Sequence, residues 1–197
     1  MMKLRYSITS PFVRKVLVTA IETGQENEIE RVKTNTADPE LAACNPLNKI
    51  PALTLEDGSV LIDSAVICEF LDHRKGAKLF PRNSTRWPVL SLMALCDGMM
   101  DAAILRRYET LRPEALRSSE WDQRQKGKVW NSLAELERQA PGFGDRVDIG
   151  TLTAAIMLDY LDFRFAHEPW RDAHPKLAQW HKAFSARPSL QATLPAD

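Results

Sequence analysis

The stretch 49–64 constrains the fold of this chain more than any other segment. It predicts two short alternating strands, 52–56 and 60–62, joined by an Asp57-Gly58 turn that is typical of a β-hairpin. After the second strand the apolar residues change to helical spacing, which predicts that a helix begins at Asp63-Ser64. The unpaired backbone N–H groups and the dipole of a helix start favour an anion, so this corner suits a carboxylate.

Pro51 opens the first of these strands, a position where a missing ladder donor is tolerated. A proline beside such a corner is also a candidate for a cis peptide bond. That bond would turn the backbone N–H and C=O of Ile50 outward, to pair with an extended ligand. The alternative is an ordinary edge-strand proline and an ordinary helix cap at Asp63.

The charge balance and the cysteine content indicate which partners and which cellular compartment to expect. The 197 residues hold 26 basic and 26 acidic side chains, so there is no basic excess to neutralise a nucleic acid. We expect no membrane span, because no run of about 18 apolar residues occurs, and no secretion sequence, because a strand pattern starts at once. Three separated cysteines, Cys44, Cys68 and Cys96, fit a reducing, cytoplasmic setting.

The four histidines do not indicate a metal site. His174 and His181 recur at helical spacing, but neither they nor His73 and His167 pair with a cysteine at ligand spacing. We therefore expect no bound metal.

The first 76 residues alternate between strand and helix patterns. Strands are predicted at 3–7 and 28–32. Helices are predicted at 10–24 and 38–44, each opened by a capping residue and a proline, and a further helix after the hairpin ends near Arg74. This order predicts an α/β layer with at least one parallel strand pair.

The helix that starts at Ser10 carries Arg14 and Lys15 in its first turn and no acid. This is the reverse of the arrangement that complements the helix dipole, so one hypothesis is a site that favours negative charge near the Ser10 hydroxyl. The alternative is that both cations are solvated or ion-paired.

The apolar periodicity stops at 75–87, and we take 77–86 as a linker. Beyond it, four amphipathic runs predict helices at 87–111, 119–139, 148–166 and 175–186, and no strand pattern follows. The expected domains are therefore 1–76, which is α/β, and 87–197, which is all helical.

Four features in this order resemble the cytosolic glutathione transferases across essentially the whole chain. They are Ser10-Pro11-Phe12 at the first helix, Asn45-Pro46 followed by Lys49-Ile50-Pro51-Ala52-Leu53, Asp63-Ser64 at the third helix, and a helical second domain after a short linker. The resemblance is to serine-type members such as the plant tau class. It implies a thioredoxin-like N-terminal domain that binds glutathione, an all-α C-terminal domain and a homodimer.

The resemblance also implies how glutathione would be held. Pro51 would be cis, and Ile50 would pair through its backbone with the cysteinyl unit. Asp63 would lie near the γ-glutamyl ammonium, with Ser64 and the helix start near the γ-glutamyl carboxylate. Lys49 matches a lysine that contacts the glycyl carboxylate.

Ser10 is the implied catalytic residue, as a donor of a hydrogen bond to the glutathione sulfur. Because a thiolate is the nucleophile, a donor beside a helix start would lower the thiol pKa and raise the reactive fraction at neutral pH. Tyr6 and Ser7 are rival donors, ranked second because they fall within or just after the strand. Omega-type relatives have cysteine where Ser10 stands, so their mixed disulfide cannot form here.

One family feature is missing from the helical domain. Members carry Ser or Thr followed three residues later by Asp at the start of the buried sixth helix, whereas Thr151 here is followed by Ala154. We therefore expect that helix to lack its reciprocal cap, at a cost of about 1 kcal/mol.

The acceptor pocket is expected to be lined by the long helix after the linker and by the C-terminal tail. Its candidate residues are Phe12, Met99, Met100, Ile104, Arg107 and Tyr108. Methionines at helical spacing are more often core packing, which is the alternative for the two in this set. The pair Arg106-Arg107 suggests an anionic acceptor as a further hypothesis.

Three functions remain open. The first is a detoxifying enzyme that conjugates glutathione to a hydrophobic electrophile, reduces a peroxide or removes halide. The second is a protein of the same fold that serves as a carrier or as a partner of other proteins without chemistry. The third is a helical regulatory protein with a small α/β cap. Retention of Ser10, Ile50-Pro51 and Asp63-Ser64 favours the first.

Overall fold

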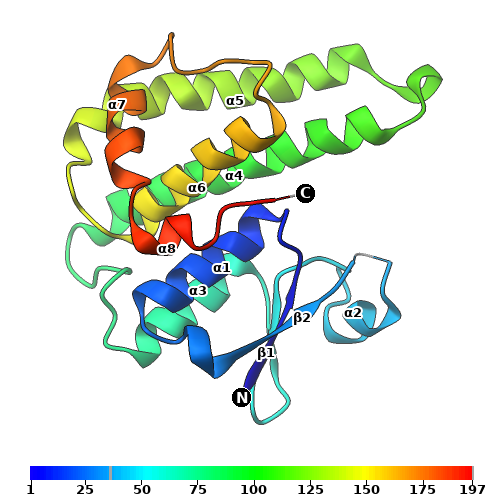
Figure 1. Ribbon diagram of the computed structural model, residues 1–197, viewed down its shortest axis with the longest axis vertical. Helices are drawn as coiled ribbons and strands as arrows, with labels where there is room; N and C mark the ends of the chain where they lie inside the picture. Colours follow the sequence, from blue (N-terminus) through cyan, green and yellow to red (C-terminus); the bar gives the residue numbers. More distant parts are fainter. Residues whose placement is uncertain (36, 197) are drawn as a thin grey trace. The chain divides into compact units, whose positions relative to one another are not determined.

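The computed structural model of the protein describes residues 1–35 and 37–196, and the chain divides into two compact units (Figure 1). Unit 1 comprises Met1–Arg86 together with Pro188–Asp197, and unit 2 comprises Trp87–Arg187. Unit 1 is α/β and unit 2 is all helical, so the predicted order of the two classes is confirmed.

A four-stranded sheet in the order β2-β1-β3-β4 forms the base of unit 1. β1 (Met2–Tyr6) and β2 (Ile29–Lys33) are parallel, which confirms the expected parallel pair. β3 (Ala52–Thr54) is antiparallel to both β1 and β4 (Val60–Leu61). The hairpin strands are shorter than predicted because 55–59 form the turn, which is closed by a 2.8 Å hydrogen bond from the N–H of Leu55 to the C=O of Ser59.

Four helices accompany this sheet. α1 (Pro11–Glu22) and α3 (Ser64–Arg74) lie side by side, α2 (Pro39–Cys44) precedes β3, and α8 (Pro188–Gln191) packs against α1 (Figure 1). A 3-10 turn, Glu26–Glu28, leads into β2. Fully buried apolar side chains make up the core: Leu4, Val13, Val16, Leu53, Ile67 and Leu71. The sequence analysis does not predict α8, because four residues are too few to reveal a helical period.

Unit 2 contains four longer helices, in the order that the amphipathic runs predict. They are α4 (Arg86–Leu111), α5 (Ser119–Gln139), α6 (Ile149–Arg164) and α7 (Pro175–Phe184), with 3-10 turns at Glu114–Leu116 and Ala140–Gly142. Twelve of the 16 residues of α6 are buried, so α6 is the central helix of this unit.

The two units differ from the expected domains at two places. Residues 77–86, expected as a linker, belong to unit 1, and the buried Asp72 carboxylate holds residues 78–80 of this segment. It accepts the backbone N–H groups of Lys78, Leu79 and Phe80 at 2.8, 2.8 and 2.9 Å. The last ten residues, expected in the helical domain, also belong to unit 1, because α8 packs against α1.

The start of α6 corrects the expectation that this helix lacks a reciprocal cap. The Asp148 carboxylate accepts the N–H of Thr151 at 2.9 Å, and the Thr151 hydroxyl accepts the N–H of Asp148 at 3.2 Å. The prediction took Thr151 as the cap and looked for its partner at Ala154. The cap is Asp148, three residues earlier, and Thr151 is its partner, so the acid and the hydroxyl residue have exchanged places. The pair still satisfies two backbone N–H groups that lack a partner within the helix.

α4 is the one helix in the described part of the chain that is long and apolar enough to cross a membrane by length and composition. Core helices of soluble proteins pass the same test, and ten residues of α4 are buried, including the charged Arg106 and Glu109. The expectation that no segment spans a membrane stays a prediction.

Candidate functional site

Three segments of unit 1 meet at one end of the sheet. Because β1 and β4 both run antiparallel to β3, the carboxyl ends of β1 and β4 lie beside the amino end of β3. The register pairs Arg5 with Ala52 and Leu53 with Leu61. Both α1 and α3 begin just beyond this end. Ser10 follows β1, Ile50-Pro51 precedes β3, and Asp63-Ser64 follows β4. The three motifs expected from the sequence therefore lie at this end of the sheet.

Ser10 caps α1 and keeps a proton to donate. Its backbone is extended and its Oγ accepts the N–H of Val13 at 3.3 Å. A serine hydroxyl has one proton and two lone pairs, so the cap uses one lone pair and leaves the proton for a ligand. The rival Ser7 shares a 3.1 Å hydrogen bond with the hydroxyl of Thr9, and Tyr6 is the last residue of β1. The ranking of Ser10 above both stays a prediction.

Asn45 shapes the loop before β3, a role that the sequence analysis does not assign. Its buried side chain donates from Nδ2 to the C=O of Lys49 at 2.8 Å and accepts the N–H of Leu47 at 3.0 Å. An asparagine side chain that bonds the backbone two residues ahead is a common turn device, so the Asn-Pro pair is a signal that could have found it.

The peptide bond that follows this loop is cis, between Ile50 and Pro51, as the resemblance implies. Lys49 is exposed and Ile50 is half-buried, so both can meet a ligand at this end of the sheet.

Asp63 and Ser64 open α3 as the sequence predicts. The Asp63 carboxylate accepts the N–H of Ala65 at 3.0 Å, and the peptide bond before Asp63 is cis. Asp63 is exposed and can meet a ligand from solvent, whereas Ser64 is buried. An exposed carboxylate beside a helix start can receive both an ammonium and a carboxylate from one zwitterionic ligand.

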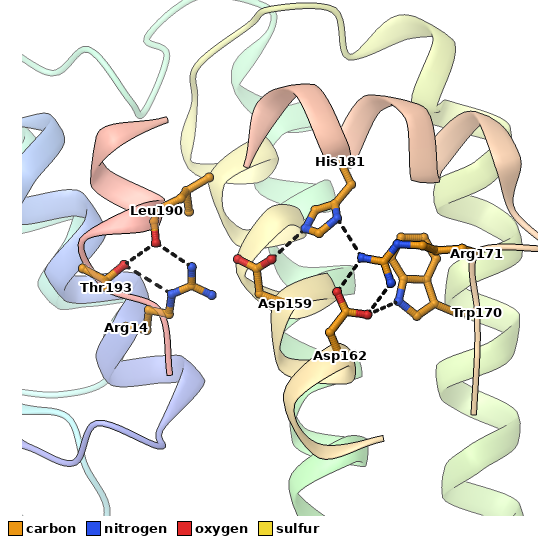
Figure 2. Close-up of polar contacts among 8 residues, drawn as sticks. All are labelled: Arg14, Asp159, Asp162, Trp170, Arg171, His181, Leu190 and Thr193. Carbon is orange, nitrogen blue, oxygen red and sulfur yellow. Dashed lines mark hydrogen bonds and ion pairs between the residues drawn. The ribbon is translucent and has the colours of Figure 1, made fainter. Parts of the chain in front are cut away.

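Arg14 and Lys15, in the first turn of α1, are both buried and not solvated. The Arg14 guanidinium donates to the C=O of Leu190 at 2.9 Å and to the hydroxyl of Thr193 at 3.2 Å (Figure 2). Lys15 Nζ lies 5.8 Å from the centre of the Phe12 ring. Two hydrogen bonds of Arg14 therefore go to the C-terminal segment of its own unit.

The acceptor candidates are distributed over both units. Phe12 is half-buried in α1. In α4, Met99 and Met100 are 1% and 0% exposed, which favours the core-packing alternative for them, whereas Ile104 and Arg107 are half-buried. Their assembly into one acceptor pocket stays a prediction.

Tyr108 lines a cleft of unit 2 that the sequence analysis does not predict. It is 56% exposed, and the cleft has a volume of about 480 Å³. Its walls come from the end of α4, the loop after it and the start of α5: Leu105, Tyr108, Glu109, Arg112, Ser118 and Trp121.

Arg106 does not offer its charge to an anionic acceptor. Its buried guanidinium bridges Asp122 at 3.0 Å and Glu168 at 2.7 Å, and it lies 4.6 Å from the centre of the Phe165 ring. Burial lowers the pKa of Arg106, but the hydrogen bonds that it donates to Glu168 and Asp122 outweigh burial and raise that pKa. This corrects the part of the anion hypothesis that rested on Arg106.

One group of residues in the described ranges has the spacing of metal ligands: Asp159, Asp162 and His181, whose ligand atoms lie within 4.8 Å of one another. His181 Nε2 is 2.8 Å from the Asp159 carboxylate (Figure 2). Both oxygens of Asp162 accept from the Arg171 guanidinium at 2.5 Å, and Trp170 Nε1 donates to one of them at 3.0 Å. Arg171 already supplies the positive charge that a metal ion would bring, so the group is a hydrogen-bonded network.

Comparison with known proteins gives a consistent result. The family profile "Glutathione S-transferase, N-terminal domain" matches residues 9–74, and "Glutathione S-transferase, C-terminal domain" matches residues 119–183. An uncharacterized GST-like protein of Escherichia coli K12, YibF, is 34% identical over 199 residues, which cover 98% of each chain.

Two solved structures extend this likeness over the full length of both chains. A glutathione transferase family member from Pseudomonas fluorescens Pf-5, with bound glutathione, has a TM-score of 0.97 and 41% identity. A glutathione S-transferase from Methylobacillus flagellatus KT, with glutathione bound, has a TM-score of 0.92 and 37% identity.

Proposed function

Because the chain belongs to the glutathione S-transferase family, we propose that it is an enzyme that binds glutathione and activates its thiol for attack on a hydrophobic electrophile or a peroxide. The observation that carries the proposal is the meeting of Ser10, Ile50-Pro51 and Asp63-Ser64 at one end of the sheet, where two helices begin. Glutathione, as the co-substrate, brings the reactive sulfur, and no metal is needed.

Ser10 is the proposed donor to the sulfur. The Ser10 Oγ accepts the N–H of Val13, which holds the hydroxyl at the start of α1. The proton of the same hydroxyl is donated to the thiolate. A hydrogen bond to the charged form and the positive end of the helix dipole both favour the anion, so the pKa of the bound thiol falls. The thiol proton leaves to solvent.

The remaining residues hold the ends of the tripeptide. The backbone of Ile50 pairs with the cysteinyl unit, and Lys49 meets the glycyl carboxylate. Asp63 faces the γ-glutamyl ammonium, and the first turn of α3 at Ser64 faces the γ-glutamyl carboxylate. Asn45 fixes the carbonyl of Lys49, so the loop is ordered before the ligand arrives.

In conjugation, the sulfur forms a bond to the electrophilic carbon and the leaving group departs with its electron pair. In peroxide reduction, the sulfur attacks the O–O bond, an alcohol leaves, and a second glutathione converts the sulfenic acid to a disulfide and water. Both reactions start from the same thiolate, so the site serves either acceptor.

Ultraviolet absorbance of the thiolate in the glutathione complex, recorded against pH, tests this proposal. We expect the bound thiol to ionise well below its solution pKa. Ser10→Ala should raise the bound pKa by about 1 to 2 units, since a hydrogen bond to a charged group is worth about 1.5–3 kcal/mol. Ser7→Ala is the matched control and should leave it unchanged. Equal ionisation in Ser10→Ala and the parent protein would remove Ser10 from the mechanism.

A second candidate is a glutathione-binding protein without chemistry. It is favoured by the helix cap that Ser10 makes, because that contact alone explains a serine at this position. Retention on a glutathione column, together with no turnover of chlorodinitrobenzene or cumene hydroperoxide, would support this candidate over the enzyme.

A cytoplasmic homodimer is the proposed assembly. The support in unit 1 is a cleft of about 380 Å³ on α3, where Val66 is 49% exposed beside Leu61, Phe70 and Phe80. A second copy of this chain is the partner that the family resemblance implies. Val66→Asp should then shift the mass in light scattering from dimer to monomer, and a monomeric parent protein would refute the assembly.

A further inference from the structure

The C-terminal segment of residues 188–193 is fastened along α1 at both ends of that helix. At the last residue of α1, the Ser189 hydroxyl donates to the Glu22 carboxylate at 2.5 Å. In the first turn, the Arg14 guanidinium donates to the C=O of Leu190 and to the hydroxyl of Thr193 (Figure 2). The segment, which we call the tail strap, therefore holds both ends of α1.

Water is excluded from the contact between Arg14 and the tail strap. Arg14 is 3% exposed and Leu190 is fully buried, while Ser189 and Thr193 are also buried. The Thr193 hydroxyl in turn donates to the C=O of Ser189 at 2.9 Å, so the strap closes on itself where Arg14 meets it. Burying a charged guanidinium is costly without hydrogen bonds, so the bonds from Arg14 Nε and Nη2 hold this side chain against the strap.

A short path of hydrogen bonds connects the tail strap to Ser10. The backbone N–H of Arg14 donates to the C=O of Ser10 at 3.0 Å, the first hydrogen bond of α1. One residue earlier, the N–H of Val13 donates to the Ser10 hydroxyl oxygen. The same turn that orients the hydroxyl is thus fixed from the other side by the strap.

We infer that the tail strap positions Ser10, with Arg14 and Thr193 as positioning residues for the ionisation of bound glutathione. The inference rests on the proposed function of Ser10. A donor that moves by a fraction of an ångström loses much of its hydrogen bond to the sulfur, because the strength of the bond falls steeply with distance and angle. Loosening the strap should therefore raise the pKa of the bound thiol without touching the residues that hold the tripeptide.

The experiment records thiolate absorbance of the glutathione complex against pH in the full-length protein. Thr193→Val removes the acceptor for Arg14 Nε and the bond that closes the strap on the C=O of Ser189, and it keeps the shape and all charges. We expect a bound thiol pKa higher by about 0.5 to 1 unit, the equivalent of one ordinary hydrogen bond. The dissociation constant of glutathione should change less than about twofold, because Lys49, Ile50, Asp63 and Ser64 are unaltered.

Arg14→Lys separates positioning from charge. Lysine keeps the positive charge near the helix start and cannot make both bonds of the guanidinium fork. The inference predicts an upward pKa shift like that of Thr193→Val, whereas a purely electrostatic role of Arg14 predicts none. Ser189→Ala, which loosens the strap only at the far end of α1, is the matched control and should not shift the thiol pKa.

The double variant Ser10→Ala/Thr193→Val tests whether the strap affects the thiol pKa through Ser10. If the strap acts through Ser10, Thr193→Val adds no shift once the Ser10 hydroxyl is gone. An additive shift would overturn the inference, and so would an unchanged thiol pKa in both Thr193→Val and Arg14→Lys. If Ser10→Ala alone has no effect, the proposed function fails first, so the two failures are distinguished.

Discussion

Asn45 donates from its side chain to the backbone C=O of Lys49 at 2.8 Å, across the loop that leads to the cis Ile50–Pro51 bond. The loop therefore has its shape before a ligand binds. The exposed Lys49 and the half-buried Ile50 therefore depend on a residue that is itself buried from solvent.

Asn45→Ala should weaken glutathione binding. Loss of the two side-chain hydrogen bonds frees the loop, and its ordering must then come from the binding energy, so we expect a dissociation constant higher by about five- to tenfold. Isothermal titration measures it. Leu47→Ala, at an exposed position of the same loop, is the control and should bind as the parent does. Equal affinity in Asn45→Ala would mean that glutathione does not use this loop.

Gly150→Ala should destabilise unit 2. A Cβ at position 150 would lie 2.8 Å from the backbone carbonyl oxygen of Val89, so α4 and α6 must separate there. Overpacking of this kind costs about 1–3 kcal/mol. Gly127→Ala in α5 meets no atom within 4 Å and should instead stabilise by about 0.5–1 kcal/mol. Chemical denaturation of both variants gives the two signs, and a destabilised Gly127→Ala would contradict this account.

Asp72→Ala should release residues 78–80 from unit 1. Three backbone N–H groups lose their charged acceptor, at an expected cost of about 2–4 kcal/mol in the free energy of unfolding. Trypsin should cut faster at Lys78 and Arg82. Asp72→Asn keeps one acceptor oxygen and should fall between the parent and Asp72→Ala. Unchanged cleavage in Asp72→Ala would show that the segment is held by other contacts.

Glu168 should make unit 2 sensitive to acid. Burial raises the pKa of its carboxyl, but hydrogen bonds from Arg106 and Lys126 outweigh it and lower that pKa to about 2. The unfolded value is near 4.5, so the stabilisation is complete above about pH 4.5 and is lost as the pH falls towards 2. After allowance for solvent screening, we expect a loss of about 1–3 kcal/mol over this window.

Glu168→Gln should flatten the acid limb of the stability curve between pH 4.5 and 2, as measured by urea denaturation at each pH. Glu135→Gln is the control: the pKa of Glu135 is also lowered to about 2, through hydrogen bonds from Arg138 and Gln139, but that pair is exposed on α5. The control should leave the acid limb nearly unchanged. An equal effect of the two variants would mean that the ion pairs of Glu168 contribute no more to stability at acid pH than an exposed pair does.

Local sequence patterns predict most elements of the fold. Ser10-Pro11 and Asp63 cap their helices in the structure as their residue types suggest, and Asp57-Gly58 forms the hairpin turn. These are local interactions, so a short window contains all the atoms involved. The prediction that α6 lacks a reciprocal cap was wrong, because Asp148-x-x-Thr151 satisfies the same two donors as the expected order of residue types.

Contacts between distant parts of the chain cannot be predicted from a short window of sequence. Asp72 looks like one more acid on a helix until residues 78–80 fold back onto it, and Arg14 looks like a solvated cation until residues 190–193 cover it. For the candidate site, the motifs indicate which residues matter, whereas only the strand register brings the three segments to one end of the sheet.

Unit 1 is assembled from both ends of the chain, since residues 188–193 complete the packing around α1. During synthesis the ribosome releases the first 86 residues long before the tail exists. The α/β unit must therefore wait, incomplete, while the whole helical unit emerges, and a chain that stops early leaves the buried guanidinium of Arg14 without the carbonyl that receives it. A chain truncated before residue 188 would therefore lack the contacts that hold the first turn of α1, which carries the proposed glutathione donor Ser10.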